Sequence, residues 1–263
     1  MNKTENIKKV ENKNHRRILT MENLLCLLII ICPILDVSSF IFRNFFNTNF
    51  SISTFVRPII PIIAMTYIFF KDKIKPQIVI AGLAYLGYAI CHIYIFYKIK
   101  TGCAYGNELR EIQYLVNYTF MVMNLFIYMY FFAVKNREKE IAEKTVGKAL
   151  EKVKKAVLIA LTIYIALMYL ALITKTSSFT YSETQVGYKG WFESGNSIGT
   201  IMLLSLFIVL PMLNKENKLS IRIWVLMLTT LVGAYLCTLL GTRTGLFGFI
   251  IVVMAYIGFT VLH

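Results

Sequence analysis

The chain has 263 residues, of which 57% are hydrophobic, and a formal net charge of +14. Soluble domains contain about 45–50% apolar residues, so the composition excludes an ordinary soluble protein and predicts an all-α, polytopic integral membrane protein. Lys and Arg fall in short clusters between apolar runs, which is the pattern of membrane topology signals and argues against nucleic acid as a partner.

Eight apolar runs predict eight transmembrane helices. Each run has roughly the 17–25 residues that a helix needs to cross the hydrocarbon core. The first run has no small-residue cleavage site after it, so we expect a retained helix and not a signal peptide. The runs cover residues 24–42, 52–70, 78–97, 112–134, 156–174, 196–213, 223–241 and 244–262.

The positions of Lys and Arg predict the orientation of these helices. Most of the 28 basic residues precede the first run or lie in alternate connections, so that side is predicted to be the cytoplasm and to hold both ends of this chain. We therefore expect a basic cytoplasmic tail (1–23), four spans (24–134), a cytoplasmic amphipathic segment (135–155) and four further spans (156–263). An extracytoplasmic loop is expected at about 175–195.

Two segments outside the spans allow alternative interpretations. Residues 135–155 have an apolar face at helical spacing, which favours a helix lying on anionic lipid over one that binds a partner protein. Aromatic residues in such a loop are typical of the membrane interface, and contact of its aromatic and acidic side chains with a glycan is the alternative. The loop at 175–195 contains Tyr181, Glu183, Tyr188, Trp191, Phe192 and Glu193.

Four arginines are predicted on the extracytoplasmic side, where the topology rule does not explain them. An arginine offers a planar fork of donors that matches a phosphate and does not lose its charge. The alternatives are snorkelling to lipid headgroups, favoured for Arg43, and pairing with a nearby acid, favoured for Arg110. For the other two, anion binding and these alternatives both remain open. The four residues are Arg43, Arg57, Arg110 and Arg243.

Polar residues within or beside the spans add further candidates. Asp36 lies in the first run, where pairing with Arg57 and substrate binding are both open. His92 is expected to be a hydrogen-bonded structural residue, with a proton relay as the alternative. Ser194 and Asn196 belong to the segment that opens the sixth span, where an Asn or Ser side chain is able to cap the helix and the free N–H groups suit an anion.

Signatures of soluble enzymes are missing from the sequence. It contains no phosphate-binding glycine loop, no nucleophile elbow, no zinc-protease motif and no dinucleotide fingerprint. The five cysteines show no spacing typical of metal ligands. We therefore expect neither a metal nor a cofactor.

Two motifs in the last third of the chain resemble those of the O-antigen ligase and polymerase superfamily. The segment GWFESGNSIG (residues 190–199) resembles the entry to one span of that superfamily, and GTRTGL (residues 241–246) resembles its arginine-containing turn. Their order and separation match as well. Arg243 occupies the arginine position of the second motif, and Asn196 occupies a position of the first.

The resemblance implies a metal-independent glycosyltransferase in the bacterial inner membrane. Such enzymes take a glycan from a polyprenyl diphosphate carrier at the outer face and join it to an acceptor glycan, for cell-surface polysaccharide assembly. It implies a catalytic role for Arg243 at the diphosphate. Arg57, Arg110, Asn196 and Asp36 are then candidates for substrate binding, and membrane lipid is a further partner. Ligase and polymerase both remain open.

The end of the chain departs from the pattern that the resemblance implies. Members of the superfamily have a further large outward loop that holds a histidine and another arginine, and the sequence stops at His263 without it. We therefore expect an incomplete chain that lacks the general base. The alternatives are a transporter of lipid-linked glycans and a non-catalytic remnant or accessory subunit.

Overall fold

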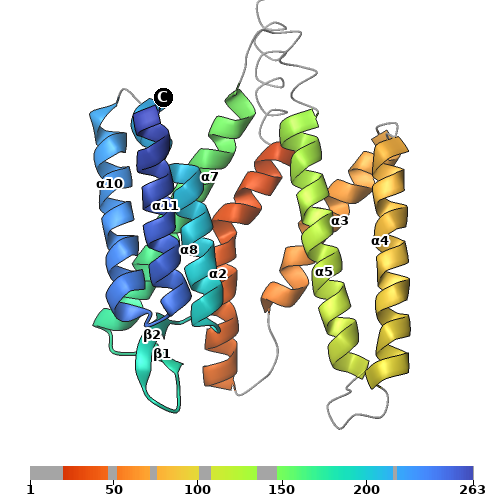
Figure 1. Cartoon of the computed structure of the whole chain (residues 1–263), viewed down its shortest axis with the longest axis horizontal. Helices are drawn as coiled ribbons and strands as arrows, with labels where there is room; N and C mark the ends of the chain where they lie inside the picture. The colour runs from red at the N-terminus through yellow and green to blue at the C-terminus, as the bar shows by residue number, and fades with distance from the viewer. Residues whose placement is uncertain are drawn as a thin grey trace, which may run out of the picture. The chain divides into compact units, whose positions relative to one another are not determined.

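The structure is a computed structural model that describes residues 20–46, 52–71, 76–100, 108–134, 147–215 and 218–262. The chain divides into two compact units (Figure 1). The first unit comprises Met1–Arg57 and Thr145–His263, and the second comprises Pro58–Lys144. Because the division falls directly after Arg57, that residue belongs to the first unit.

The first unit is a bundle of long apolar helices with one small hairpin. Its core is formed by side chains of α7, α8, α10 and η3, among which Leu161, Met168, Met202, Leu206 and Tyr235 are fully buried. The elements are α2 (Met21–Phe46), α7 (Lys148–Ile173), β1 (Ser178–Tyr181), β2 (Val186–Gly190), α8 (Gly195–Val209), α9 (Met212–Lys215), α10 (Leu219–Ala234), the π-helix η3 (Tyr235–Leu239) and α11 (Arg243–Leu262).

Helices α8 and α11 run parallel and lie close together. A Cβ added to Gly248 of α11 would lie 2.4 Å from Leu203 Cδ1 of α8, so a larger residue there would require the Leu203 side chain to move. Further along, the Asn214 side chain of α9 donates to Thr260 Oγ1 at 3.3 Å and accepts from the Tyr256 hydroxyl at 2.8 Å. Both helices therefore begin at the same end of the unit, beside the hairpin (Figure 1).

The hairpin β1–β2 lies against the turn that joins η3 to α11. Its strands are antiparallel, with Phe179 opposite Tyr188. The Thr180 hydroxyl donates to the Leu240 carbonyl at 3.0 Å, and the Tyr235 hydroxyl donates to the Tyr188 carbonyl at 2.7 Å. These bonds tie the start of α11 to the hairpin.

A glycine is required where the hairpin meets this turn. Gly187 has a φ of 72°, which lies in the left-handed region that side chains disfavour. A Cβ at Gly187 would also lie 2.4 Å from the Leu240 carbonyl oxygen. Both the conformation and the packing therefore depend on the missing side chain.

The second unit contains the remaining helices. The His92 ring of α4 lies 3.3 Å from the Glu111 carboxylate of α5, and the Tyr85 and Thr119 hydroxyls are 2.8 Å apart. The hydrogen bond expected for His92 is therefore present. The elements are α3 (Ile52–Lys71, of which Pro58 onward belongs here), α4 (Pro76–Ile95), the π-helix η1 (Phe96–Lys100), α5 (Glu108–Tyr128) and the π-helix η2 (Met129–Val134).

A helix occupies each of the eight predicted runs, and the chain is mostly helical as expected. Among the described residues, five helices are long and apolar enough to cross a membrane. The number of eight spans, the orientation of the termini and the division into segments stay predictions. Residues 135–146 of the predicted amphipathic segment lie outside the described residues, and its last residues belong to α7. The five candidate membrane spans are Met21–Phe42, Leu150–Ile173, Gly195–Lys215, Leu219–Leu239 and Arg243–Leu262.

Candidate functional site

The start of α8 forms the centre of the candidate site. Ser194 is the N-cap residue, and its hydroxyl accepts the backbone N–H of Ser197 at 3.3 Å, which confirms the predicted cap. Asn196 and Ser197 are exposed. The side chain of Asn196 therefore stands at a helix end, where the remaining backbone N–H groups and the helix dipole favour a negative charge.

Asp36 of α2 is held by two donors. The Arg57 guanidinium donates to Asp36 Oδ1, and the Tyr164 hydroxyl of α7 donates to Asp36 Oδ2 at 2.7 Å. The side chains of Arg57 and Asp36 are 42% and 22% exposed, so the pair is half-buried. The predicted pairing of these two residues is confirmed, and the positive charge of Arg57 is compensated within the protein.

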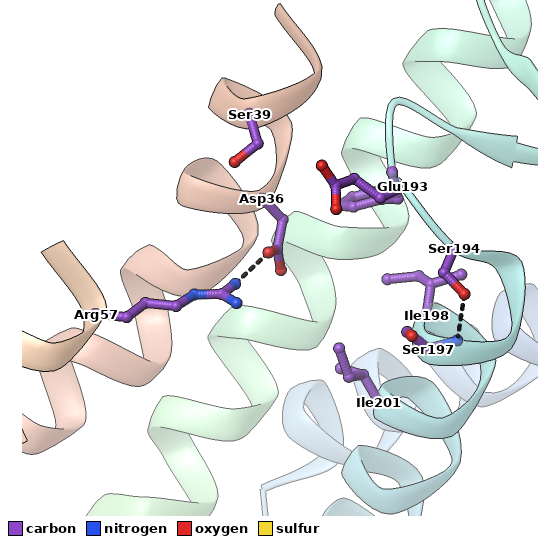
Figure 2. A pocket seen from close by; sticks show the side chains of 9 residues that line it. Asp36, Ser39, Arg57, Glu193, Ser194, Ser197, Ile198 and Ile201 are labelled. Atoms are coloured by element: carbon purple, nitrogen blue, oxygen red, sulfur yellow. Dashed lines mark hydrogen bonds and ion pairs between the residues drawn. The ribbon is translucent and has the colours of Figure 1, made fainter. Parts of the chain in front are cut away.

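A pocket of about 220 Å³ lies between Asp36 and the start of α8 (Figure 2). Asp36 and Arg57 line one wall, and the first turns of α8 line the facing wall. Tyr164 contacts two of the lining residues, since it donates to Asp36 and its ring centroid lies 5.4 Å from that of the buried Phe192. The lining residues are Asp36, Ser39, Arg57, Phe192, Glu193, Ser194, Ser197, Ile198 and Ile201.

Arg243 has a different environment from Arg57. It is the first residue of α11, it is exposed, and it forms no ion pair or hydrogen bond with the part of the chain that the structure describes. Its neighbour Thr242 is 3% exposed, and the Thr242 hydroxyl has no hydrogen-bond partner among the described residues. Arg243 is therefore a cation at a helix N-terminus that is available to a ligand.

The starts of α8 and α11 are neighbours. A Cβ at Gly199, in the second turn of α8, would lie 3.9 Å from the Thr242 hydroxyl oxygen. Two parallel helices thus present their first turns at one end of the unit, with Arg243 on the second of them (Figure 1). Two such ends combined with a guanidinium form a region suited to a phosphate group.

The structure brings together only some of the predicted site residues. Asp36 and Arg57 line the pocket, and Asn196 stands between two of its lining serines in sequence. Arg243 belongs to the neighbouring helix end and does not line the pocket. Arg110 lies in the first turn of α5 in the second unit, and its side chain is outside the described part.

Several residues of the pocket were not singled out from the sequence. Ser39 and Ser197 line the pocket, and Tyr164 fixes Asp36. Tyr164 is a tyrosine inside an apolar run. Such a position is only a weak indication of a binding site, because most tyrosines there simply pack against neighbouring side chains. Ser197 was visible as part of the motif at residues 190–199, but its spacing gave no reason to choose it over its neighbours.

Long apolar helices and a polar site at one end of the bundle define a multi-pass membrane protein with a candidate anion-binding end. The model of one family, O-antigen ligase like membrane protein, matches residues 19–262. The chain therefore belongs to this family, which confirms the predicted family resemblance. No curated protein and no solved structure matches the chain significantly.

Proposed function

We propose that the protein is a glycosyltransferase of the bacterial cytoplasmic membrane that transfers or polymerises glycans from a polyprenyl diphosphate carrier at the outer face. Membership of the O-antigen ligase like family supports a ligase or polymerase role. The single observation that carries the proposal is the exposed, unpartnered Arg243 at the start of α11, within the part of the chain that the structure describes.

The proposed chemistry is the departure of a diphosphate. The acceptor hydroxyl attacks the sugar carbon that bears the carrier, a new glycosidic bond forms, and the hydroxyl proton passes to solvent. As the bond between the sugar and the carrier breaks, negative charge grows on the leaving diphosphate. A guanidinium that offers two parallel donors stabilises this charge more in the transition state than in the ground state, which lowers the barrier. The helix ends of α8 and α11 add backbone N–H donors, and Asn196 contributes an amide at the same end.

Replacement of Arg243 by Ala tests this proposal. The variant is expressed in a strain that lacks the chromosomal gene, and the surface polymer or ligated glycan is measured. We expect a loss of about 100-fold, the effect of removing one charge-stabilising donor. Lys218→Ala is the matched control, because Lys218 is also a cation at a helix start, that of α10. Undiminished product in Arg243→Ala, at equal protein level, would refute the proposal.

A transporter of lipid-linked glycans is the second candidate, and the half-buried Asp36–Arg57 pair favours it, since ionised residues in spans often mark a transport path. Purified protein separates the two. Transfer of a glycan from a carrier to an acceptor in detergent, where no membrane separates two compartments, supports the transferase. Movement of carrier across a vesicle membrane without any transfer supports the transporter.

A further inference from the structure

The starts of α8 and α11 are capped differently. At α8 the Ser194 hydroxyl accepts the Ser197 N–H at 3.3 Å. At α11 the residue in the same position is Thr242, whose carbonyl accepts the Leu246 N–H at 3.2 Å. Threonine commonly caps helices, but the Thr242 hydroxyl has no hydrogen-bond partner among the described residues. The first N–H groups of α11 therefore carry no cap from this side chain.

The Thr242 hydroxyl is enclosed where α11 packs on α8. Thr242 is only 3% exposed. A Cβ at Gly245, the third residue of α11, would lie 2.8 Å from Thr242 Oγ1, and a Cβ at Gly199 of α8 would lie 3.9 Å from it. The hydroxyl therefore lies beside the first turn of α11, on the side that faces α8.

This arrangement lowers the stability of the protein without a ligand. A buried hydroxyl gives up its hydrogen bonds to water, and at Thr242 no bond to the described residues replaces them. Valine has nearly the same shape and lacks the hydroxyl, so it would fill the same space without this cost. Buried polar groups without a partner are uncommon in folded proteins, and a bound ion or a functional role is among the few explanations for them.

An anion at the start of α11 would supply the missing partner. Arg243 directly follows Thr242, is exposed and has no partner among the described residues. Its guanidinium, the uncapped N–H groups and the helix dipole all favour a negative charge at this end. The hydroxyl has no bond to lose, so donation to a charged oxygen is a net gain. Because the hydroxyl is covered, this contact requires the Thr242 side chain to turn about its Cα–Cβ bond, a type of change that is common on binding.

We infer that Thr242 is a further ligand-binding residue, whose hydroxyl donates to a phosphate oxygen of the carrier diphosphate held by Arg243 at the start of α11. The inference rests on the proposed function, because that function supplies the diphosphate. It adds a neutral donor to the guanidinium. It also assigns different roles to the two helix starts, since Ser194 uses its hydroxyl as a cap and Thr242 keeps its hydroxyl for the ligand.

Binding of inorganic pyrophosphate tests this assignment without any transfer reaction. The purified protein in nanodiscs is titrated with pyrophosphate by calorimetry, and its Tm is measured without ligand. Thr242→Val should weaken pyrophosphate binding about tenfold, the size of one hydrogen bond to a charged group, and raise the Tm by about 2–4 °C. Thr242→Ser keeps the hydroxyl and should keep most of the affinity. A purely structural role would instead lower affinity and Tm together.

A second threonine and a second ligand provide the controls. The Thr229 hydroxyl of α10 is partly buried and already donates to the Val225 carbonyl at 2.8 Å. Thr229→Val should therefore neither raise the Tm nor change pyrophosphate binding. Farnesyl diphosphate, a short analogue of the carrier, should compete with pyrophosphate for the site. Without such competition the site holds a free phosphate compound, and the assignment to the carrier is wrong.

The outcomes separate this inference from the proposed function. Unchanged affinity or a lower Tm in Thr242→Val, an equal loss of affinity in Thr242→Ser, or no binding of pyrophosphate to the unmodified protein would overturn the role of Thr242. In each case a loss of product in Arg243→Ala would still support the transferase. Conversely, the expected opposite changes in affinity and Tm, together with undiminished product in Arg243→Ala, would refute the transferase alone.

Discussion

Arg57 and Arg243 both belong to the first unit and both were predicted to face the outer side, but their surroundings differ. Arg57 is half-buried and its charge is compensated by Asp36, which Tyr164 also holds. Arg243 is exposed at a helix start and has no partner among the described residues. The difference teaches that an arginine near a span is a candidate for binding an anion when no acid of the protein already compensates its charge.

Replacement of Arg243 and replacement of Arg57 should have different effects on product and on stability. Arg243→Ala should lower product by about 100-fold and leave the free energy of unfolding within about 0.5 kcal/mol. Arg57→Ala should instead destabilise the protein, because Asp36 loses its charged donor. Product from cells and unfolding in mixed micelles measure the two effects. An equal loss of product and no loss of stability in both variants would abolish the distinction.

The Asp36 pair provides the second test. Asp36→Ala should destabilise the protein by about 2 kcal/mol, less than for a fully buried pair because the Arg57 side chain is 42% exposed. The double variant Asp36→Ala with Arg57→Ala should cost less than the sum of the single variants, since neither charge is then left unpaired. Simple additivity of the two unfolding free energies would show that the pair contributes nothing.

The sequence predicted the local features of this site better than the distant ones. The apolar runs located the helices, the depth of Asp36 and Arg57 in consecutive runs predicted their pairing, and the Ser194 cap followed from its position before a span. These features depend on neighbouring residues or on position along a helix. They can be recognised without knowing which helices pack together.

The missed features depend on contacts between distant parts of the chain. Tyr164 reaches Asp36 across 128 residues, and Thr180 reaches the Leu240 carbonyl across 60. Neither contact produces a periodic pattern. The hairpin itself lies in the predicted loop at 175–195, whose aromatic residues were interpreted by their place at the membrane interface. In the structure, Tyr188 pairs with Phe179, and its carbonyl accepts a hydrogen bond from the Tyr235 hydroxyl.

The hairpin provides the third test, because it supports the turn before Arg243 and not the Asp36 pair. Gly187→Ala should destabilise the protein by about 1–3 kcal/mol, since a Cβ meets the Leu240 carbonyl and φ is positive. It should also lower product by displacing Arg243.

Gly82→Ala is the control: its Cβ meets nothing within 4 Å, so we expect stabilisation of about 0.5–1 kcal/mol for alanine in a helix. Unchanged stability in Gly187→Ala would mean that the hairpin does not hold the turn.

The smallest effect is expected at Ser194. This residue lies at the start of α8, which lines the Asp36 pocket and is a neighbour of the start of α11. Ser194→Ala removes the acceptor for the Ser197 N–H and should cost about 1 kcal/mol of stability. Ser194→Asp keeps an acceptor and adds a negative charge, which a helix N-terminus stabilises, so the variant should retain stability.

The same negative charge should weaken the binding of an anion held between the starts of α8 and α11. Product should therefore fall in Ser194→Asp more than in Ser194→Ala, although the aspartate variant is the more stable one. If product instead follows stability across the two variants, Ser194 acts only as a cap, and the start of α8 takes no part in binding the diphosphate.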